Sequence, residues 1–268
     1  MPTAPARDNQ LAEPSTRRHI DSKLVGWGID DPVLIMGLVT AGTVGVLIGF
    51  LIDHFATNLT PEASRGVLIA GGVVGAGLIA FAAALSLRSS VTKLTEAVVV
   101  TRILPFGGSE LVLDVGCGRG ALSVVIAKKL TTGLVISLDV WDPWHITGNS
   151  PQSLLANAEN VGVGERVAGI KAIGAAIPFP DMKFDVVASC LGLQHEGNFD
   201  EFDNSVKDMV RVLKEGGRFT VLCSGYGGRL TKLLASLGMT EIRASRVRAG
   251  IIPLAQRISA RKSFVQPA

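Results

Sequence analysis

Cysteine, aromatic side chains and clusters of positive charge are all scarce in this sequence. Its three cysteines, Cys117, Cys190 and Cys223, are far apart and form no CxxC or Cys/His spacing. This pattern excludes a disulfide framework and gives no zinc site, so we expect no metal and three reduced thiols packed as small apolar side chains. The formal net charge is only +3 and lysine and arginine form no block, which argues against a nucleic-acid partner.

Charge is missing altogether from two long stretches, residues 33–52 and 66–87. The whole chain is nevertheless 18% charged, with a mean hydropathy of +0.39, so its apolar residues are concentrated in a few segments. A bilayer core about 30 Å thick requires roughly 20 apolar helical residues. We therefore expect residues 33–87 to form a two-helix transmembrane hairpin, with two buried helices of a water-soluble protein as the alternative.

Glycines spaced four residues apart predict close packing of the two helices, because small residues let helix backbones approach each other. They are Gly45 and Gly49 in the first stretch, and Gly71 and Gly75 in the second.

The distribution of basic residues predicts the orientation of the hairpin. Basic residues lie before the first stretch and after the second, whereas the connector 53–65 holds only Arg65. By the positive-inside rule, both termini and the domain after the hairpin lie in the cytoplasm. Residues 1–32 are polar and are expected to form a disordered cytoplasmic tail, not a secretory signal. The basic residues that carry the prediction are Arg17, Arg18 and Lys23 before the hairpin, and Arg88, Lys93 and Arg102 after it.

Residues 88–268 have the character of a soluble α/β domain. After an amphipathic lead-in helix over 91–104, short apolar runs alternate with helical patterns, which indicates βαβ units and a mainly parallel, doubly wound, seven-stranded sheet. Strands are expected over 110–115, 134–140, 167–173, 184–191, 217–223, 240–246 and 255–260, and helices over 121–130, 151–160, 204–213 and 228–237.

A glycine-rich loop follows the first expected strand and opens a helix. Its sequence is Asp114-Val115-Gly116-Cys117-Gly118-Arg119-Gly120-Ala121. Glycines in this context permit a tight turn and close approach of the backbone to a ligand. The spacing also satisfies the dinucleotide pattern, so alone it does not distinguish NAD from S-adenosylmethionine. A carboxylate ahead of the glycines favours a cationic ligand over a pyrophosphate, and thus S-adenosylmethionine.

The later segments, taken in order, resemble the class I (Rossmann-like) S-adenosylmethionine-dependent methyltransferases with a type 11-like domain. The stretch 148–163 is similar to a sub-branch of that family with N-terminal membrane helices. The segments that carry the resemblance are 112–120, 137–140, 177–181, 184–187 and 211–218.

The resemblance implies S-adenosylmethionine as cofactor and a role for each matching residue. Asp114 would face the amino group of the methionine part, and Asp139 would accept hydrogen bonds from the ribose hydroxyls. Val140 and Trp141 would pack on adenine, with a plain core role as the alternative for Trp141. The implied cofactor-binding set is Asp114, Gly116, Cys117, Gly118, Gly120, Asp139, Val140, Trp141, Ile173, Gly174 and Cys190.

One position departs from the family. Ile173 stands where an acid usually accepts a hydrogen bond from the adenine amino group, a loss on the order of 1 kcal/mol of binding. A catalytically silent membrane protein that keeps the fold is therefore the main alternative to an active methyltransferase, ahead of an NAD(P)-dependent oxidoreductase.

The acceptor side is less defined by the sequence. His195, after the fourth strand, is the candidate base or acceptor-orienting residue, with a loop-structuring role as the alternative. The hairpin suggests a lipophilic small-molecule or lipid acceptor, because tethering raises effective concentration at the membrane. The expected location is a bacterial plasma membrane, with two spans and a cytoplasmic catalytic domain.

Overall fold

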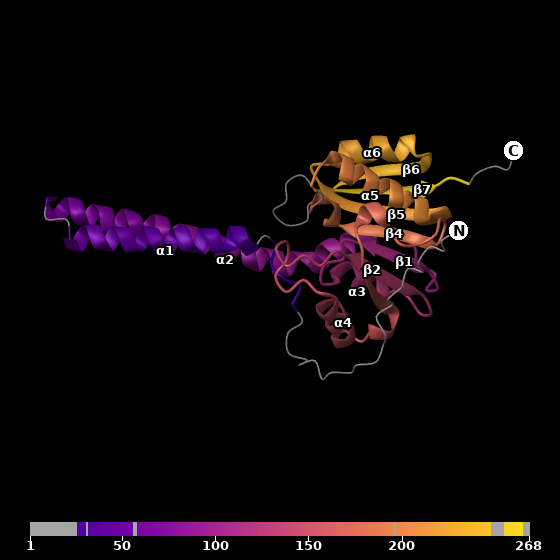
Figure 1. The fold of residues 1–268 in the computed structure, drawn as a ribbon, viewed down its shortest axis with the longest axis horizontal. Helices are drawn as coiled ribbons and strands as arrows, with labels where there is room; N and C mark the ends of the chain where they lie inside the picture. Colours follow the sequence, from indigo (N-terminus) through magenta and orange to yellow (C-terminus); the bar gives the residue numbers. More distant parts are fainter. Residues whose placement is uncertain (1–25, 31, 56–57, 196, 248–254, 265–268) are drawn as a thin grey trace, which may run out of the picture.

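The computed structural model describes residues 26–30, 32–55, 58–195, 197–247 and 255–264. It consists of a long helical hairpin that projects from an α/β domain (Figure 1).

The hairpin consists of α1 (Pro32–Phe55) and α2 (Pro61–Thr101). The hydroxyl of Thr60 caps the start of α2 by accepting a hydrogen bond from the Ala63 amide at 3.3 Å. The helix then continues for 41 residues without a break. The apolar span and the lead-in helix, which the sequence suggested as separate helices, are therefore one continuous helix that runs from the hairpin into the α/β domain.

The two hairpin helices are largely exposed in the described structure. Each is long and apolar enough to cross a membrane, yet only 11% of the residues in its most apolar window are buried. Large side chains such as Met36 and Val73 are 69% and 68% exposed. This exposure argues against the alternative of two buried helices.

Glycines form the contact between α1 and α2. A Cβ on Gly75 would lie 2.5 Å from the Gly42 carbonyl oxygen, and one on Gly71 would lie 2.9 Å from the Gly45 carbonyl oxygen. A Cβ on Gly49 would lie 3.3 Å from the Val67 carbonyl oxygen, so this glycine packs closely against α2 as well. The expected glycine contact is therefore present, but Gly42 supplies its tightest point and was not among the predicted pairs.

The domain is built on a seven-stranded sheet of order β3-β2-β1-β4-β5-β7-β6. The first five strands are parallel, whereas β7 pairs antiparallel with both β5 and β6. The sheet is thus mixed, since an antiparallel strand is inserted next to β5. The strands are β1 (Leu111–Val115), β2 (Leu134–Asp139), β3 (Val167–Lys171), β4 (Phe184–Cys190), β5 (Leu213–Ser224), β6 (Met239–Arg246) and β7 (Ala255–Lys262).

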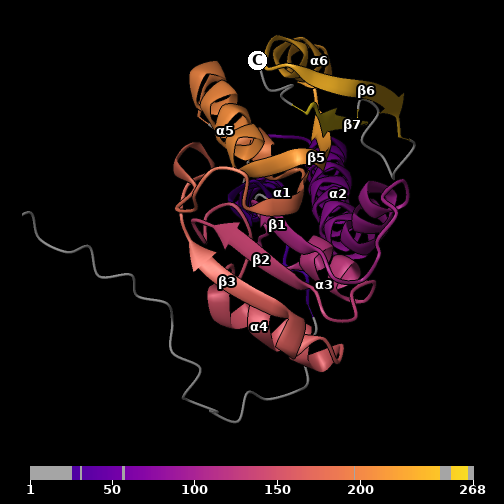
Figure 2. The ribbon, with the colours of Figure 1, turned by 90° about the vertical axis from the view of Figure 1, so that its right-hand side faces the viewer.

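Helices cover both faces of the sheet, with α3 and α4 on one face and α5 on the other (Figure 2). Successive strand residues point to opposite faces, so Val112 joins the core under α2, α3 and α4, and Leu113 joins the core under α5 and α6. The helices are α3 (Ala121–Ala127), α4 (Pro151–Asn160), α5 (Phe199–Val212) and α6 (Gly227–Ser236), with short 3-10 turns η1 (Gly164–Arg166), η2 (Gly174–Ala176) and η3 (Gly192–His195).

Residues 26–30, which we call the strap, pack on the domain just before α1 begins. Ile29 donates its amide to the Thr147 hydroxyl at 2.7 Å, and its carbonyl accepts the Thr147 amide at 3.0 Å. The Asn157 amide donates to the Gly26 carbonyl at 3.3 Å, and Trp27 is buried. The expectation of a disordered tail over residues 1–32 therefore fails for the strap, while residues 1–25 lie outside the described part of the chain.

Candidate active site

The glycine loop turns sharply at the carboxyl end of β1. Gly116 and Cys117 donate their amides to the Leu138 carbonyl at 2.8 and 3.1 Å, which fastens the turn to β2. Gly116 has φ +70°, and a Cβ there would lie 2.6 Å from the Cα of Gly192. Only glycine fits this position, because both the dihedral angle and the space exclude a side chain.

Asp114 is fully buried beneath the loop. Its Oδ2 accepts a hydrogen bond from the Ser123 hydroxyl at 2.6 Å, and Ser123 in turn accepts one from Ser137 at 2.7 Å. Its Oδ1 has no hydrogen-bond partner among the described residues. Burial raises the pKa of Asp114 to about 7, against the smaller effect of the Ser123 hydrogen bond. One buried carboxylate oxygen is thus available to a ligand.

Asp139 organises the loop from the end of β2. Its two oxygens accept the Gly118 amide at 2.7 Å and the Trp141 amide at 2.6 Å. The Asn149 side-chain amide approaches Oδ1 at 3.4 Å. The carboxylate therefore holds the glycine loop in place directly.

Two residues of the implied cofactor set do not line the pocket. Trp141 turns inward with φ +51° and donates its indole N–H to the Gly118 carbonyl at 3.1 Å. Gly120 lies against α4, where a Cβ would come within 2.3 Å of the Leu154 side chain. Trp141 thus supports the glycine loop and Gly120 allows α3 and α4 to pack, and neither residue lines the pocket.

The structure brings the rest of that set together around one pocket. Ile173, at the position that usually holds an acid, is 55% exposed on its rim. Burial raises the pKa of the Cys117 and Cys190 thiols, which therefore stay neutral. The predicted residues that line the pocket are Asp114, Gly116, Cys117, Gly118, Asp139, Val140, Ile173, Gly174 and Cys190.

His195 remains a prediction. It ends η3, whose residues Gly192 and Leu193 line the pocket. The His195 side chain lies outside the described part of the structure.

Several pocket residues were missed by sequence reasoning. Trp27 and Asp30 come from the strap, and Lys93 and Glu96 from the domain end of α2. The sequence signal for the α2 residues was the pair Lys93 and Glu96, the only charged residues in the stretch 91–100. Residues three apart share a helix face, so the pair indicates a polar position on an otherwise uncharged segment. His145 is half-buried and lines the pocket as well.

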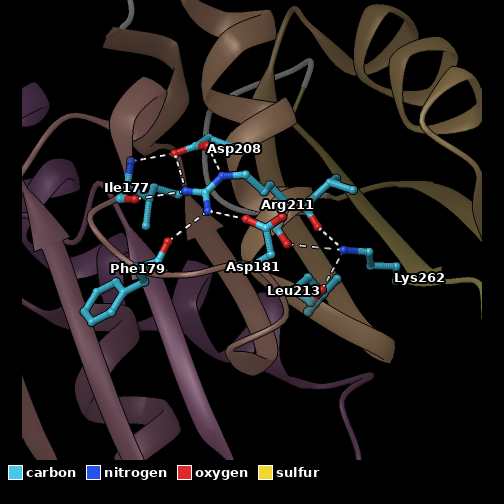
Figure 3. Close-up of polar contacts among 8 residues, drawn as sticks. Ile177, Phe179, Asp181, Asp208, Arg211, Leu213 and Lys262 are labelled. Carbon is cyan, nitrogen blue, oxygen red and sulfur yellow. Dashed lines mark hydrogen bonds and ion pairs between the residues drawn. The ribbon is translucent and has the colours of Figure 1, made fainter.

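Arg211 fixes the loop that follows η2 (Figure 3). Its guanidinium donates to the carbonyls of Ile177 and Phe179 at 3.0 and 2.8 Å. It also pairs with Asp208 at 2.6 Å and Asp181 at 2.7 Å, and the hydrogen bonds to these acids raise the pKa of Arg211. The loop that begins after η2 is thereby held against α5.

Comparison with known proteins supports a methyltransferase assignment. Residues 113–221 match a family model described as a methyltransferase domain. The ubiquinone/menaquinone biosynthesis C-methyltransferase UbiE of Salmonella arizonae is 34% identical over 114 residues, which are 42% of each chain. The chain thus spans about two fifths of the length of the curated relatives it matches.

Two solved structures share the fold. The 1,6-didemethyltoxoflavin-N1-methyltransferase of Burkholderia thailandensis, solved with S-adenosylhomocysteine, is 18% identical with a TM-score of 0.51, over 65% of this chain and 79% of that one. The [4+2]-cyclase SpnF is 18% identical with a TM-score of 0.52, over 64% and 81%. At this identity the likeness concerns the fold.

The pocket suits S-adenosylmethionine by its own chemistry. Asp114 Oδ1 and Asn149 Oδ1 are buried acceptors without a hydrogen-bond partner among the described residues, and buried acceptors require donors. The ammonium and ribose hydroxyls of the cofactor are such donors. The glycine loop, the buried acids and the matched family model together support an S-adenosylmethionine-dependent methyltransferase domain that includes residues 113–221.

Proposed function

We propose that the protein is a membrane-anchored enzyme that methylates a lipophilic small molecule. The observation that carries the proposal is the position of the pocket. It is lined by Asp30, two residues before α1 begins at Pro32, and by Lys93 and Glu96 on α2. The apolar hairpin thus leaves the domain beside the pocket.

Exposed apolar side chains around the pocket support the same proposal. Val140 and Ile173 line it and are 40% and 55% exposed. Trp144, next to pocket-lining His145, is 71% exposed. Tryptophan favours the membrane–water interface, so these residues suit a rim that meets the bilayer. The name of the UbiE relative, a quinone-biosynthesis C-methyltransferase, is consistent with an acceptor of that kind.

The chain's own residues would bind and orient the reactants. S-adenosylmethionine, when bound, supplies the activated methyl group and a neutral leaving group. Asp114 and Asn149 would hold the cofactor through their unpartnered oxygens, and Asp139 would keep the glycine loop in its binding conformation. Alignment of acceptor and methyl group then accounts for most of the rate, and His195 stays the candidate base.

The topology belongs to the proposal too. We propose two spans, one in α1 and one in α2, in a bacterial plasma membrane. The basic residues that flank the hairpin support an orientation with both termini and the domain in the cytoplasm. The close glycine contacts between α1 and α2 suit a membrane hairpin, because small residues favour helix packing there.

The test uses the full-length protein in lipid nanodiscs with S-adenosylmethionine labelled in its methyl group. A bacterial lipid extract is the acceptor source, and excess S-adenosylhomocysteine is the control that should abolish transfer. We expect label in the organic phase after extraction. Label that enters only water-soluble products would contradict the lipophilic acceptor but leave the methyltransferase intact.

A second candidate is a membrane protein that keeps the fold without methyl transfer. Ile173 favours it, because the pocket has a hydrophobic side chain at the position of the usual adenine-binding acid. Cofactor binding without label transfer to either phase would support this candidate.

A further inference from the structure

The asparagine two residues before α4 has a buried oxygen that no described residue satisfies. Asn149 lines the pocket and is only 7% exposed, and its Oδ1 accepts no hydrogen bond within the described part of the chain. Folded proteins pair nearly all buried acceptors, because an unpaired acceptor loses its hydrogen bonds to water without replacement. This oxygen therefore requires a donor, which a molecule bound in the pocket can supply.

The direction of the Asn149 side-chain amide is determined by two neighbouring acceptors. Its Nδ2 donates to Oδ1 of Asp139 at 3.4 Å and to the main-chain carbonyl of Asp142 at 3.3 Å. Rotation of the amide by half a turn would bring its own oxygen against these two acceptors. The nitrogen therefore faces Asp139 and Asp142, and Oδ1 faces away from them.

The main chain around Asn149 is held as well. The Asn149 amide donates to the Ile146 carbonyl at 3.1 Å, and the Ser153 hydroxyl donates to the Gly148 carbonyl at 2.8 Å. The next residue, Ser150, caps the start of α4 through its hydroxyl. The side chain therefore projects from a turn that is fixed before any ligand binds.

Asp139 lines the same pocket and has little acceptor capacity left. A carboxylate offers about four lone-pair sites. Three are used, by the Gly118 amide at 2.7 Å, the Trp141 amide at 2.6 Å and the side-chain nitrogen of Asn149. Since Oδ1 already accepts two of these donors, about one site remains, on Oδ2.

Asp139 stands where a Rossmann-like fold binds a ribose. An acid about 20 residues after the glycine loop accepts a ribose hydroxyl in such folds, and Asp139 follows Gly118 by 21 residues. The ribose of S-adenosylmethionine carries two neighbouring hydroxyls, and the remaining site on Asp139 pairs with only one. We propose that Asn149 Oδ1 accepts the other hydroxyl, while Asp139 fixes the direction of the Asn149 amide. The inference rests on the proposed function and adds a specificity residue from the turn before α4.

The experiment is calorimetric titration of the full-length protein in nanodiscs with S-adenosylhomocysteine and with its 2′-deoxy and 3′-deoxy analogues. Each analogue lacks one hydroxyl, and Asn149→Leu removes one acceptor at similar side-chain size. We expect each analogue to bind the wild type about tenfold more weakly than S-adenosylhomocysteine, because each leaves a buried acceptor unpaired. Asn204→Leu, at an exposed site on α5, is the matched control and should bind all three ligands as the wild type does.

The variant identifies which hydroxyl depends on Asn149. In Asn149→Leu, S-adenosylhomocysteine should bind about tenfold more weakly than in the wild type. One of the two analogues should then match it to within about twofold, because its missing hydroxyl has no acceptor left to lose. The other analogue should still bind about tenfold more weakly, since its missing hydroxyl pairs with Asp139.

An analogue that binds the wild type as tightly as S-adenosylhomocysteine would overturn the inference, because its missing hydroxyl would have no buried acceptor. Both analogues binding Asn149→Leu about tenfold more weakly than S-adenosylhomocysteine would overturn it too, since neither hydroxyl would depend on Asn149. Absence of S-adenosylhomocysteine binding to the wild type would instead overturn the cofactor site of the proposed function. If Asn149→Leu melts well below the wild type, Asn149→Ala, which adds no bulk to the turn, repeats the comparison with the same expected and contradicting results.

Discussion

Replacement of Asp139 by asparagine should destabilise the glycine loop even when no ligand is bound. The wild-type carboxylate accepts two main-chain amides, from Gly118 at 2.7 Å and Trp141 at 2.6 Å. An asparagine has one oxygen, so whichever way its amide is turned, one of these buried N–H groups faces another donor. A buried donor left without an acceptor costs about 1–3 kcal/mol.

We therefore expect Asp139→Asn to lower the free energy of unfolding by about 2 kcal/mol, which corresponds to roughly 4–8 °C in the melting temperature of a domain of this size. Asp139→Ala leaves both amides unsatisfied and should lower it about twice as far. Cofactor affinity should fall by at least tenfold in both variants, because Gly118 then loses its fixed position.

The measurements are thermal unfolding followed by near-ultraviolet circular dichroism and calorimetric titration of S-adenosylhomocysteine. Asp142→Asn is the matched control, since the Asp142 side chain accepts the exposed Trp144 amide at 2.9 Å and lies three residues along the chain. A variant Asp139→Asn with wild-type melting and lost binding would refute the reasoning, because Asp139 would then act on the ligand alone.

Three further predictions concern the buried acid, the loop clamp and the hairpin. Burial raises the folded pKa of Asp114 to about 7, above its value in an unfolded chain, so unfolding free energy should fall as pH rises from about 4 to 7; Asp114→Asn should flatten this slope in pH-dependent melting. Arg211→Met removes the donors to two carbonyls and should lower the free energy of unfolding by about 2–4 kcal/mol. It should also speed amide hydrogen exchange over 177–181, whereas Lys207→Met on the exposed side of α5 should leave that exchange unchanged. Unchanged exchange in Arg211→Met would contradict the role of Arg211 in holding this loop. Gly75→Leu should separate α1 from α2 because a Cβ there meets the opposite backbone, whereas Gly77→Leu, which faces open space, should leave cross-linking between the two helices unchanged.

Local sequence patterns were sufficient for most elements of the domain. Strand β1 could be predicted because a short apolar run leads directly into the glycine loop; it is buried on both faces, with Val112 in one core and Leu113 in the other. Helix α4 has the predicted bounds because Ser150 caps it and Pro151 occupies its first turn, and both are local signals. The start of β5 was predicted four residues late, at 217, because Gly216 with φ +70° interrupts the apolar pattern inside the strand.

Only part of the candidate site could be predicted from the sequence. Asp114, Gly116 and Gly118 follow a strand directly, so their convergence is a consequence of chain geometry over a few residues. Trp141 follows β2 just as closely, yet it turns inward to the Gly118 carbonyl. Adjacency in sequence placed the residue beside the site but did not determine the direction of its side chain.

The sequence by itself determined the two apolar helices, the α/β domain and the glycine loop, because each depends on interactions between near neighbours. Only the tertiary structure decided that the strap and α2 complete the pocket. Lys93 reaches the Trp27 carbonyl across 66 positions of sequence, and Ile29 meets Thr147 across 118. Such contacts exist because the hairpin turns the chain back on itself, so that residues before α1 and at the end of α2 meet above the sheet.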